Sequence, residues 1–138
     1  MPDTATADPF GPVVFAYTRR QAIKDGVLVD VTESAREAGF RIPVALSRAV
    51  WERLVALPDG YRGFQDEAGR LWDVLWMARH HALRAADSDR VTMSVLVRDV
   101  RKDLRDSDRP PRRHRPVVAI GPGDEGSPVI TIMFPEDD

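Results

Sequence analysis

A turn-dense segment between two β-forming stretches closes the sequence and constrains the fold more than any other feature. Residues 121–127 contain the turn formers glycine, proline and aspartate, with residues 117–120 before them and residues 128–134 after them. Both flanks are rich in valine and isoleucine, which favour strands. Glycine and proline supply the backbone angles that reverse a chain within a few residues. The pattern predicts an antiparallel hairpin that completes a sheet.

The same turn has a second interpretation as an anion-binding loop, since successive backbone N–H groups in a glycine-rich turn can form a concave nest. A phosphate loop of the Walker type needs a lysine and a hydroxyl residue followed by a helix, whereas here a strand follows. We therefore favour a plain hairpin connection. In that hairpin Asp124 and Glu125 form an exposed acidic tip.

Two long helices are predicted upstream of the hairpin. The first covers 43–57, because Pro43 suits a first helical turn and apolar residues then recur at helical spacing. Those residues are Leu46, Val50, Leu54 and Leu57. The second helix covers about 66–86, where one side is apolar. That side carries Leu71, Val74, Leu75, Ala78, Ala82 and Leu83.

Three tryptophans fall within these two predicted helices. Trp72 and Trp76 widen the apolar side of the second helix, and Trp51 belongs to the first. We expect all three to pack in the core or between helices. A tryptophan that is exposed instead would be a strong anchor for an interface.

Shorter elements are predicted near the N-terminus. Thr18 is a suitable N-cap for a helix over 19–25, and Gly26 can take the left-handed conformation that ends it. Residues 27–31 then form a compact, β-branched segment. This segment predicts a short, half-buried strand.

Two further elements are predicted from local patterns. A brief helix begins at Thr32 or Ser34, because Ser34 and Glu37 have the spacing of a reciprocal capping box. From residue 91 to residue 97 the apolar residues alternate with a period of two. That alternation predicts a strand with one buried face.

Together these patterns predict one α+β domain over 13–138, after a flexible lead-in over 1–12. A small antiparallel sheet of three to four strands, including the C-terminal hairpin, would pack against the two long helices. A chain of 138 residues with 43% apolar content can enclose one core without disulfides or a metal.

Composition excludes several classes of protein. The chain has no cysteine, so a disulfide framework, thiolate catalysis and cysteine-ligated zinc are ruled out. No apolar run approaches the roughly 18 to 20 residues that span a bilayer. We therefore expect a cytoplasmic protein without membrane contact. The net charge of −2 argues against a broadly cationic nucleic-acid binder, so any electrostatic role must be local.

The most charged segment is residues 101–115, predicted to be a long exposed loop. It contains seven basic residues against three aspartates, and two prolines but no aromatic residue. Such a loop could contact phosphates or an acidic protein surface, or could simply be solvated. The candidate binding residues are Arg101, Lys102, Arg105, Arg109, Arg112, Arg113 and Arg115, together with Asp124 and Glu125 at the hairpin tip.

No catalytic or metal site stands out. His80 and His81 are adjacent on a predicted helix and point about 100° apart, so they cannot hold one metal from one face. Four aspartates could converge as a magnesium site for hydrolysis, although turns and strand ends explain most of them locally. These are Asp25, Asp30, Asp99 and Asp124. We assign no catalytic residue, metal or cofactor.

Three blocks of the sequence resemble an uncharacterised family of small proteins that carries a domain-of-unknown-function label and occurs on bacterial plasmids, phages and other mobile elements. The blocks are YTRRQAIKDGVLVDV at 17–31, FRIPVAL at 40–46 with Val50-Trp51, and GPGD at 121–124 with VITIM at 129–133. They follow the family's order and, with their spacing, span about 17–135. The resemblance brings no established catalytic residues, and the segment 101–115 is longer and more basic here than the family pattern.

The resemblance implies a small non-enzymatic accessory protein of a mobile element that acts by protein–protein binding. Inhibition of a host defence nuclease, of the anti-restriction or anti-CRISPR type, is the form we favour from that setting. Nucleic-acid binding through the basic segment is the alternative, and a carboxylate-dependent metal hydrolase is a third. The expected partner is a protein, and a homo-oligomer stays open.

Overall fold

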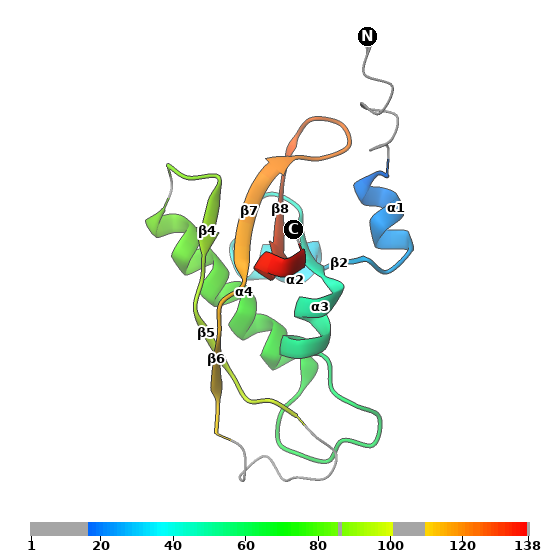
Figure 1. Ribbon diagram of the computed structural model, residues 1–138, viewed down its shortest axis with the longest axis vertical. Helices are drawn as coiled ribbons and strands as arrows, with labels where there is room; N and C mark the ends of the chain where they lie inside the picture. Colours follow the sequence, from blue (N-terminus) through cyan, green and yellow to red (C-terminus); the bar gives the residue numbers. More distant parts are fainter. Residues whose placement is uncertain (1–16, 86, 101–109, 138) are drawn as a thin grey trace.

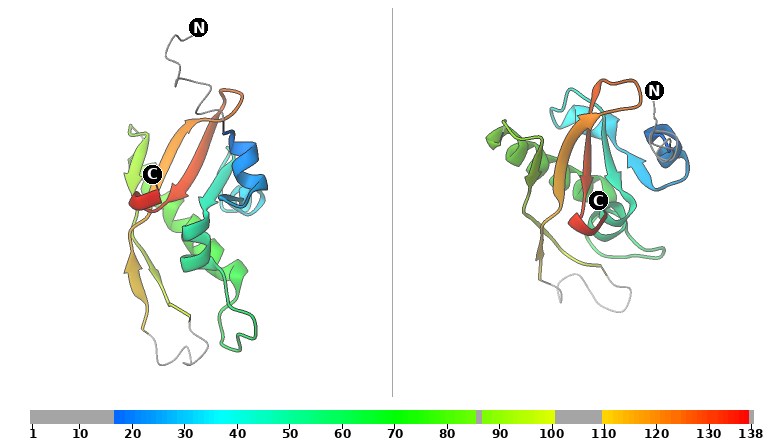
Figure 2. Two further views of the ribbon diagram at one scale, coloured as in Figure 1. Left: turned by 45° about the vertical axis from the view of Figure 1, so that its right-hand side comes forward. Right: turned by 45° about the horizontal axis from the view of Figure 1, so that its top comes forward.

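A computed structural model describes residues 17–85, 87–100 and 110–137. In this part of the chain one long helix packs against one face of a five-stranded mixed sheet. A separate two-stranded sheet extends from one end of the five-stranded sheet (Figure 1; Figure 2). The strands are β2 (Leu28–Asp30), β3 (Val44–Ser47), β4 (Arg90–Thr92), β5 (Val95–Val97), β6 (Arg112–His114), β7 (Val117–Pro122) and β8 (Pro128–Met133). The helices are α1 (Arg19–Lys24), α2 (Thr32–Glu37), α3 (Arg48–Val50), a π-helical turn (Trp51–Val55), α4 (Glu67–Arg84) and a 3-10 turn (Pro135–Asp137).

The prediction of a helix capped by Thr18 and ended by Gly26 is confirmed. The Thr18 hydroxyl accepts a hydrogen bond from the Gln21 backbone N–H at 3.0 Å, and the Gln21 side chain accepts one from Thr18 N at 3.2 Å. Gly26 has φ of 78°, the left-handed conformation that favours glycine. This end of α1 leads directly into β2.

Helix α2 exists where it was predicted, but the proposed capping box is wrong. The helix begins at Thr32. Its N-cap residue is Val31, whose side chain makes no capping hydrogen bond. Asp30 instead accepts hydrogen bonds from the Thr32 backbone N–H at 3.0 Å and the Thr32 hydroxyl at 2.6 Å. An aspartate in an Asx turn thus starts the helix before Ser34 can act as a cap.

The predicted long helix over 43–57 is wrong, so the described part of the chain has one long helix, α4, and not two. Residues Val44–Ser47 form β3, which is buried on both faces. Ser47 then caps a short helical segment by accepting a hydrogen bond from the Val50 backbone N–H at 3.2 Å. Because β3 is buried on both faces, its sequence lacks the alternation of apolar and polar residues that marks a strand. The four-residue spacing of Leu46 and Val50 then matches the helical period.

The C-terminal hairpin is confirmed, but the purely antiparallel sheet of three to four strands is wrong. Strands β7 and β8 pair antiparallel, with Val118 opposite Ile132. The other edge of β8 pairs parallel with β3, placing Leu46 opposite Ile132. The order across the sheet is β2-β3-β8-β7-β4, so a strand from the first half of the chain adjoins the last one.

The strand predicted over 91–97 divides into two strands of different sheets. Strand β4 pairs with β7, and β5 pairs with β6. Between them the Met93 backbone N–H donates to the Pro116 carbonyl at 2.9 Å, and the Met93 side chain is fully buried. The alternation of buried residues continues through the break, which is why the sequence shows one strand.

The core lies between one face of the larger sheet and helices α2 and α4 (Figure 2). Helix α4 contributes Leu71, Val74, Leu75 and Ala78, and the sheet contributes Val44, Leu46, Val118, Ile130 and Ile132. No helix in the described ranges is long and apolar enough to cross a bilayer.

Candidate partner-binding surface

The outer face of α4 carries two exposed tryptophans. Trp72 is 43% exposed and Trp76 is 51% exposed, and their rings stack with centroids 6.0 Å apart and planes 17° from parallel. The expectation that these tryptophans pack in the core is wrong; Trp51 alone is partly buried against it. Each exposed tryptophan follows a buried leucine, Leu71 or Leu75, and one residue turns a helix by about 100°. That rotation carries both rings away from the core.

A hollow of about 310 Å³ lies beside Trp76, between α4 and the β5–β6 sheet. It is lined by Asp73, Trp76, Met77, Ser94, Val95, Leu96 and Arg113. Leu96 is 56% exposed and lies opposite Arg113 in the strand register, so both side chains are on the same face of this small sheet, and both line the hollow. We call Trp72, Asp73, Trp76, Leu96 and Arg113 the α4 surface.

The two charged members of the α4 surface differ in their surroundings. The Arg113 guanidinium donates to the Ser94 hydroxyl. Asp73 is an exposed residue, yet partial burial of its carboxyl raises the pKa above its ordinary value. Among the described residues, none donates a hydrogen bond to this carboxylate or forms an ion pair with it. The α4 surface therefore combines stacked aromatic area with a partly desolvated acid.

Within the described part of the basic segment, residues 110–115, Arg112–His114 form strand β6, where a loop was predicted. Arg112 and Arg113 belong to β6, and Arg115 follows it as an exposed residue. Arg112 forms an ion pair with Asp99 at 3.2 Å, and His114 Nε2 lies 3.4 Å from the same carboxylate. The candidate residues Arg101, Lys102, Arg105 and Arg109 lie outside the described residues, as does the lead-in over 1–12.

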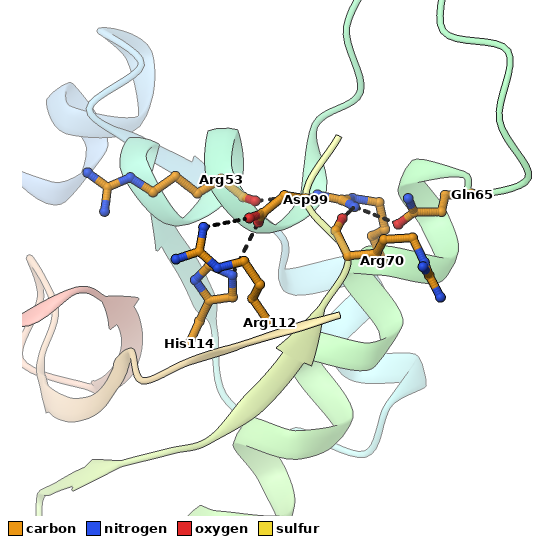
Figure 3. A network of polar contacts seen from close by, with 7 residues as sticks. Arg53, Gln65, Arg70, Asp99, Arg112 and His114 are labelled. Carbon is orange, nitrogen blue, oxygen red and sulfur yellow. Dashed lines mark hydrogen bonds and ion pairs between the residues drawn. The ribbon is translucent and has the colours of Figure 1, made fainter. Parts of the chain in front are cut away.

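Next to Asp99, a buried arginine ties three segments of the chain together (Figure 3). Arg70 on α4 is only 6% exposed. Its guanidinium donates to the Val55 carbonyl at 2.9 Å, to the Arg98 carbonyl at 2.7 Å and to the Gln65 side-chain oxygen at 2.6 Å. The π-helical turn, the loop before α4 and the end of β5 are thereby joined to one side chain, which supports the base of the β5–β6 sheet.

Asp124 does not project freely from the hairpin tip, because it binds the N-terminus of α1. Its two carboxylate oxygens accept hydrogen bonds from the backbone N–H groups of Arg19 at 2.8 Å and Arg20 at 3.0 Å. The Arg19 side chain in turn donates to the Ile130 carbonyl and the Thr131 hydroxyl of β8, both at 2.7 Å. Glu125, the other residue of the predicted acidic tip, is exposed and makes no such contact.

This contact predicts a local dependence on pH. The N–H groups of Arg19 and Arg20 hold the pKa of the Asp124 carboxyl below its usual value. Its stabilising contribution is therefore complete above the ordinary aspartate pKa of about 3.9 and is lost as pH falls through the lower folded value. We expect the protection factors of the Arg19 and Arg20 amides, which are corrected for the intrinsic pH dependence of exchange, to fall over that acidic range, and Asp124→Asn to remove most of this change. Glu125→Gln is the control, and an equal effect from it would contradict the assignment.

The four aspartates proposed as a metal site have separate roles. Asp25 accepts from the Tyr17 hydroxyl at 2.8 Å, Asp30 starts α2, Asp99 faces Arg112, and Asp124 binds α1. No group of three acidic or histidine side chains in the described part of the chain could hold a metal ion. In the described residues these four aspartates therefore do not form a group that could hold a metal ion.

The fold and surface define a small α+β domain whose most unusual feature is an exposed aromatic pair on a rigid helix. The chain belongs to a family of unknown function, DUF6573, whose model matches residues 10–138. It matches no curated protein and no solved structure. This membership confirms one part of the resemblance seen in the sequence, namely that the chain belongs to an uncharacterised domain family.

Proposed function

We propose that the protein acts by binding another protein through the α4 surface and catalyses no reaction of its own. The observation that carries the proposal is the stacked, exposed pair of Trp72 and Trp76. Tryptophan is among the residues most enriched at binding hot spots, because a large ring buries much apolar area while losing few rotamers. A helix of 18 residues, packed on the core along its other face, holds the pair rigidly.

The partner's chemistry follows from the α4 surface. An apolar or aromatic side chain would fill the hollow between Trp76 and Leu96. A basic group would meet Asp73, whose partly desolvated carboxylate lacks a cation among the described residues, and an acidic group would meet Arg113. The partner surface is therefore apolar at its centre with charges at its edge, which is the usual arrangement of protein interfaces.

Removing the aromatic pair is expected to abolish partner binding without unfolding the protein. Trp72→Ala/Trp76→Ala should weaken the affinity by about 100-fold or more, since hot-spot truncations cost about 2 kcal/mol or more each. The protein should stay folded, because both residues are already about half exposed and neither belongs to the core. The measurement is capture of the partner on immobilised protein, followed by titration with the purified partner. Ile120→Thr, at a strand residue of 40% exposure outside the α4 surface, is the matched control; equal loss in both variants would refute the proposal.

The family resemblance extends this proposal to the kind of partner. The protein would be an accessory factor of a mobile element, and its target would be a host defence nuclease that it inhibits by occlusion. The expected result is stoichiometric inhibition of DNA cleavage by that nuclease, absent with Trp72→Ala/Trp76→Ala. Recovery of no specific partner from host lysates, with and without the defence system, would contradict this extension.

Nucleic-acid binding is the second candidate, favoured by the exposure of Arg112, Arg113 and Arg115 on one short segment. It predicts a salt-sensitive mobility shift of DNA or RNA, because counterions are released when arginines neutralise phosphates. Replacing all three arginines with alanine should abolish the shift. The absence of any shift at low salt would end this candidate.

A further inference from the structure

The α4 surface places a projecting group and a matching hollow on the same face of the molecule. Trp76 stands out from α4 and is 51% exposed, and the hollow of about 310 Å³ begins directly beside its ring. A twofold interface requires this arrangement, because each copy must offer both members of every contact from one patch. A surface that only received a different protein would not need both.

The charges of the α4 surface are also self-complementary. Asp73 and Arg113 both line the hollow, one from α4 and the other from β6. They form no ion pair with each other in the structure: the Arg113 guanidinium donates to the Ser94 hydroxyl, and partial burial raises the pKa of Asp73. One acid and one base on a single patch can meet their opposites when the patch is rotated onto itself.

We infer that two copies of this chain associate through the α4 surface around a twofold axis, with Trp76 of each copy in the hollow of the other and Asp73 of each copy facing Arg113 of the other. The inference rests on the proposed function in one respect, namely that this surface binds protein. A net charge of only −2 on the chain leaves little general repulsion between copies. Self-association covers the tryptophan pair, so a different target protein would bind the monomer in competition with the dimer.

Charge reversal tests this arrangement without knowledge of any other partner. Asp73→Lys alone puts lysine opposite Arg113 at both symmetric positions, and Arg113→Glu alone puts glutamate opposite Asp73 at both. Each variant is expected to weaken the dimer by about 100-fold or more in sedimentation equilibrium, because like charges face each other twice.

An equimolar mixture of the two variants restores opposite charges at both positions of the interface. The introduced lysine of one variant then faces the introduced glutamate of the other, and the native Arg113 of the first faces the native Asp73 of the second. The mixture should therefore form a heterodimer, with an affinity within about 10-fold of the wild-type homodimer.

Three results would overturn the inference: a wild-type protein that stays monomeric up to about 100 µM, charge variants that dimerise as well as wild type, or folded variants whose mixture stays monomeric. Circular dichroism reports whether each variant is folded. If a charge variant does not fold, Trp76→Ala decides, since a persistent dimer contradicts the arrangement and a monomer of unchanged melting temperature supports it. These outcomes do not depend on capture of a different protein, so the proposed function can fail separately.

Discussion

Replacing Arg70 with methionine is expected to lower the free energy of unfolding by about 3 to 5 kcal/mol. The substitution keeps most of the apolar volume of the side chain but removes every donor. The Val55 and Arg98 carbonyls and the Gln65 amide oxygen then lose the hydrogen bonds that Arg70 supplies in a site where the arginine is only 6% exposed. The hydrogen bond to Val55 is buried and those to Gln65 and Arg98 are partly buried, and a buried acceptor left without a donor costs about 1 to 3 kcal/mol. Urea unfolding followed by tryptophan fluorescence measures the change.

Arg84→Met is the matched control for this prediction. Arg84 has the same side chain and lies on the same helix, but it is exposed in the last turn. Its removal should cost no more than about 1 kcal/mol, the size of a charge interaction with the helix dipole. Equal losses in the two variants would mean that Arg70 does not join the segments around it.

Leu46 and Ile132 are expected to be energetically coupled, because the parallel pairing of β3 with β8 places them opposite each other. Both side chains are fully buried. Leu46→Ala should cost about 2 to 5 kcal/mol and Ile132→Val about 0.5 to 1.5 kcal/mol. The double variant should depart from the sum by about 0.5 kcal/mol or more, since neighbouring core residues share a cavity. A double-mutant cycle of unfolding free energies gives the coupling.

Leu83→Ala is the control for the cycle with Leu46. Leu83 is 62% exposed on α4 and has no place in the core. Its effect should add to that of Leu46→Ala within about 0.5 kcal/mol. If the unfolding free-energy changes of Leu46→Ala and Ile132→Val were also additive, the parallel pairing of β3 with β8 would be contradicted.

Elements defined by local chemistry could be predicted from the sequence. Thr18 and Gly26 set the two ends of α1 through a cap and a left-handed turn. The hairpin of β7 and β8 follows from turn formers between β-branched residues, and α4 follows from its helical period. In each case the residues that determine the element lie within it or next to it.

Elements defined by distant partners could not be predicted. Strand β3 exists because β8, more than 80 residues later in the chain, supplies its hydrogen-bonding edge. Its four residues are all buried, so they show no alternation of apolar and polar residues that would predict a strand. The role of Asp124 was missed for the same reason, since the hydrogen bonds that it accepts come from Arg19 and Arg20 near the other end of the chain.

The candidate surface was misplaced because charge is more conspicuous in a sequence than aromatic exposure. The predicted site centred on the basic segment, of which Arg113 lines the hollow beside Trp76. The sequence predicts that the tryptophans pack in the core or between helices, because they fall within predicted helices and widen an apolar side. Their position one residue after Leu71 and Leu75 was the available sign that they face outward.

Photo-crosslinking from position 96 tests most directly whether the α4 surface binds protein. A benzoylphenylalanine in place of Leu96, an exposed residue beside the hollow, leaves both tryptophans in place. We predict adducts to protein from position 96 in cells and none from position 120, an exposed strand residue outside this surface, with loss of the adducts in Trp72→Ala/Trp76→Ala. The adduct mass separates a second copy of the chain from a different partner. The absence of adducts at position 96, or equal adducts at both positions, would contradict the account.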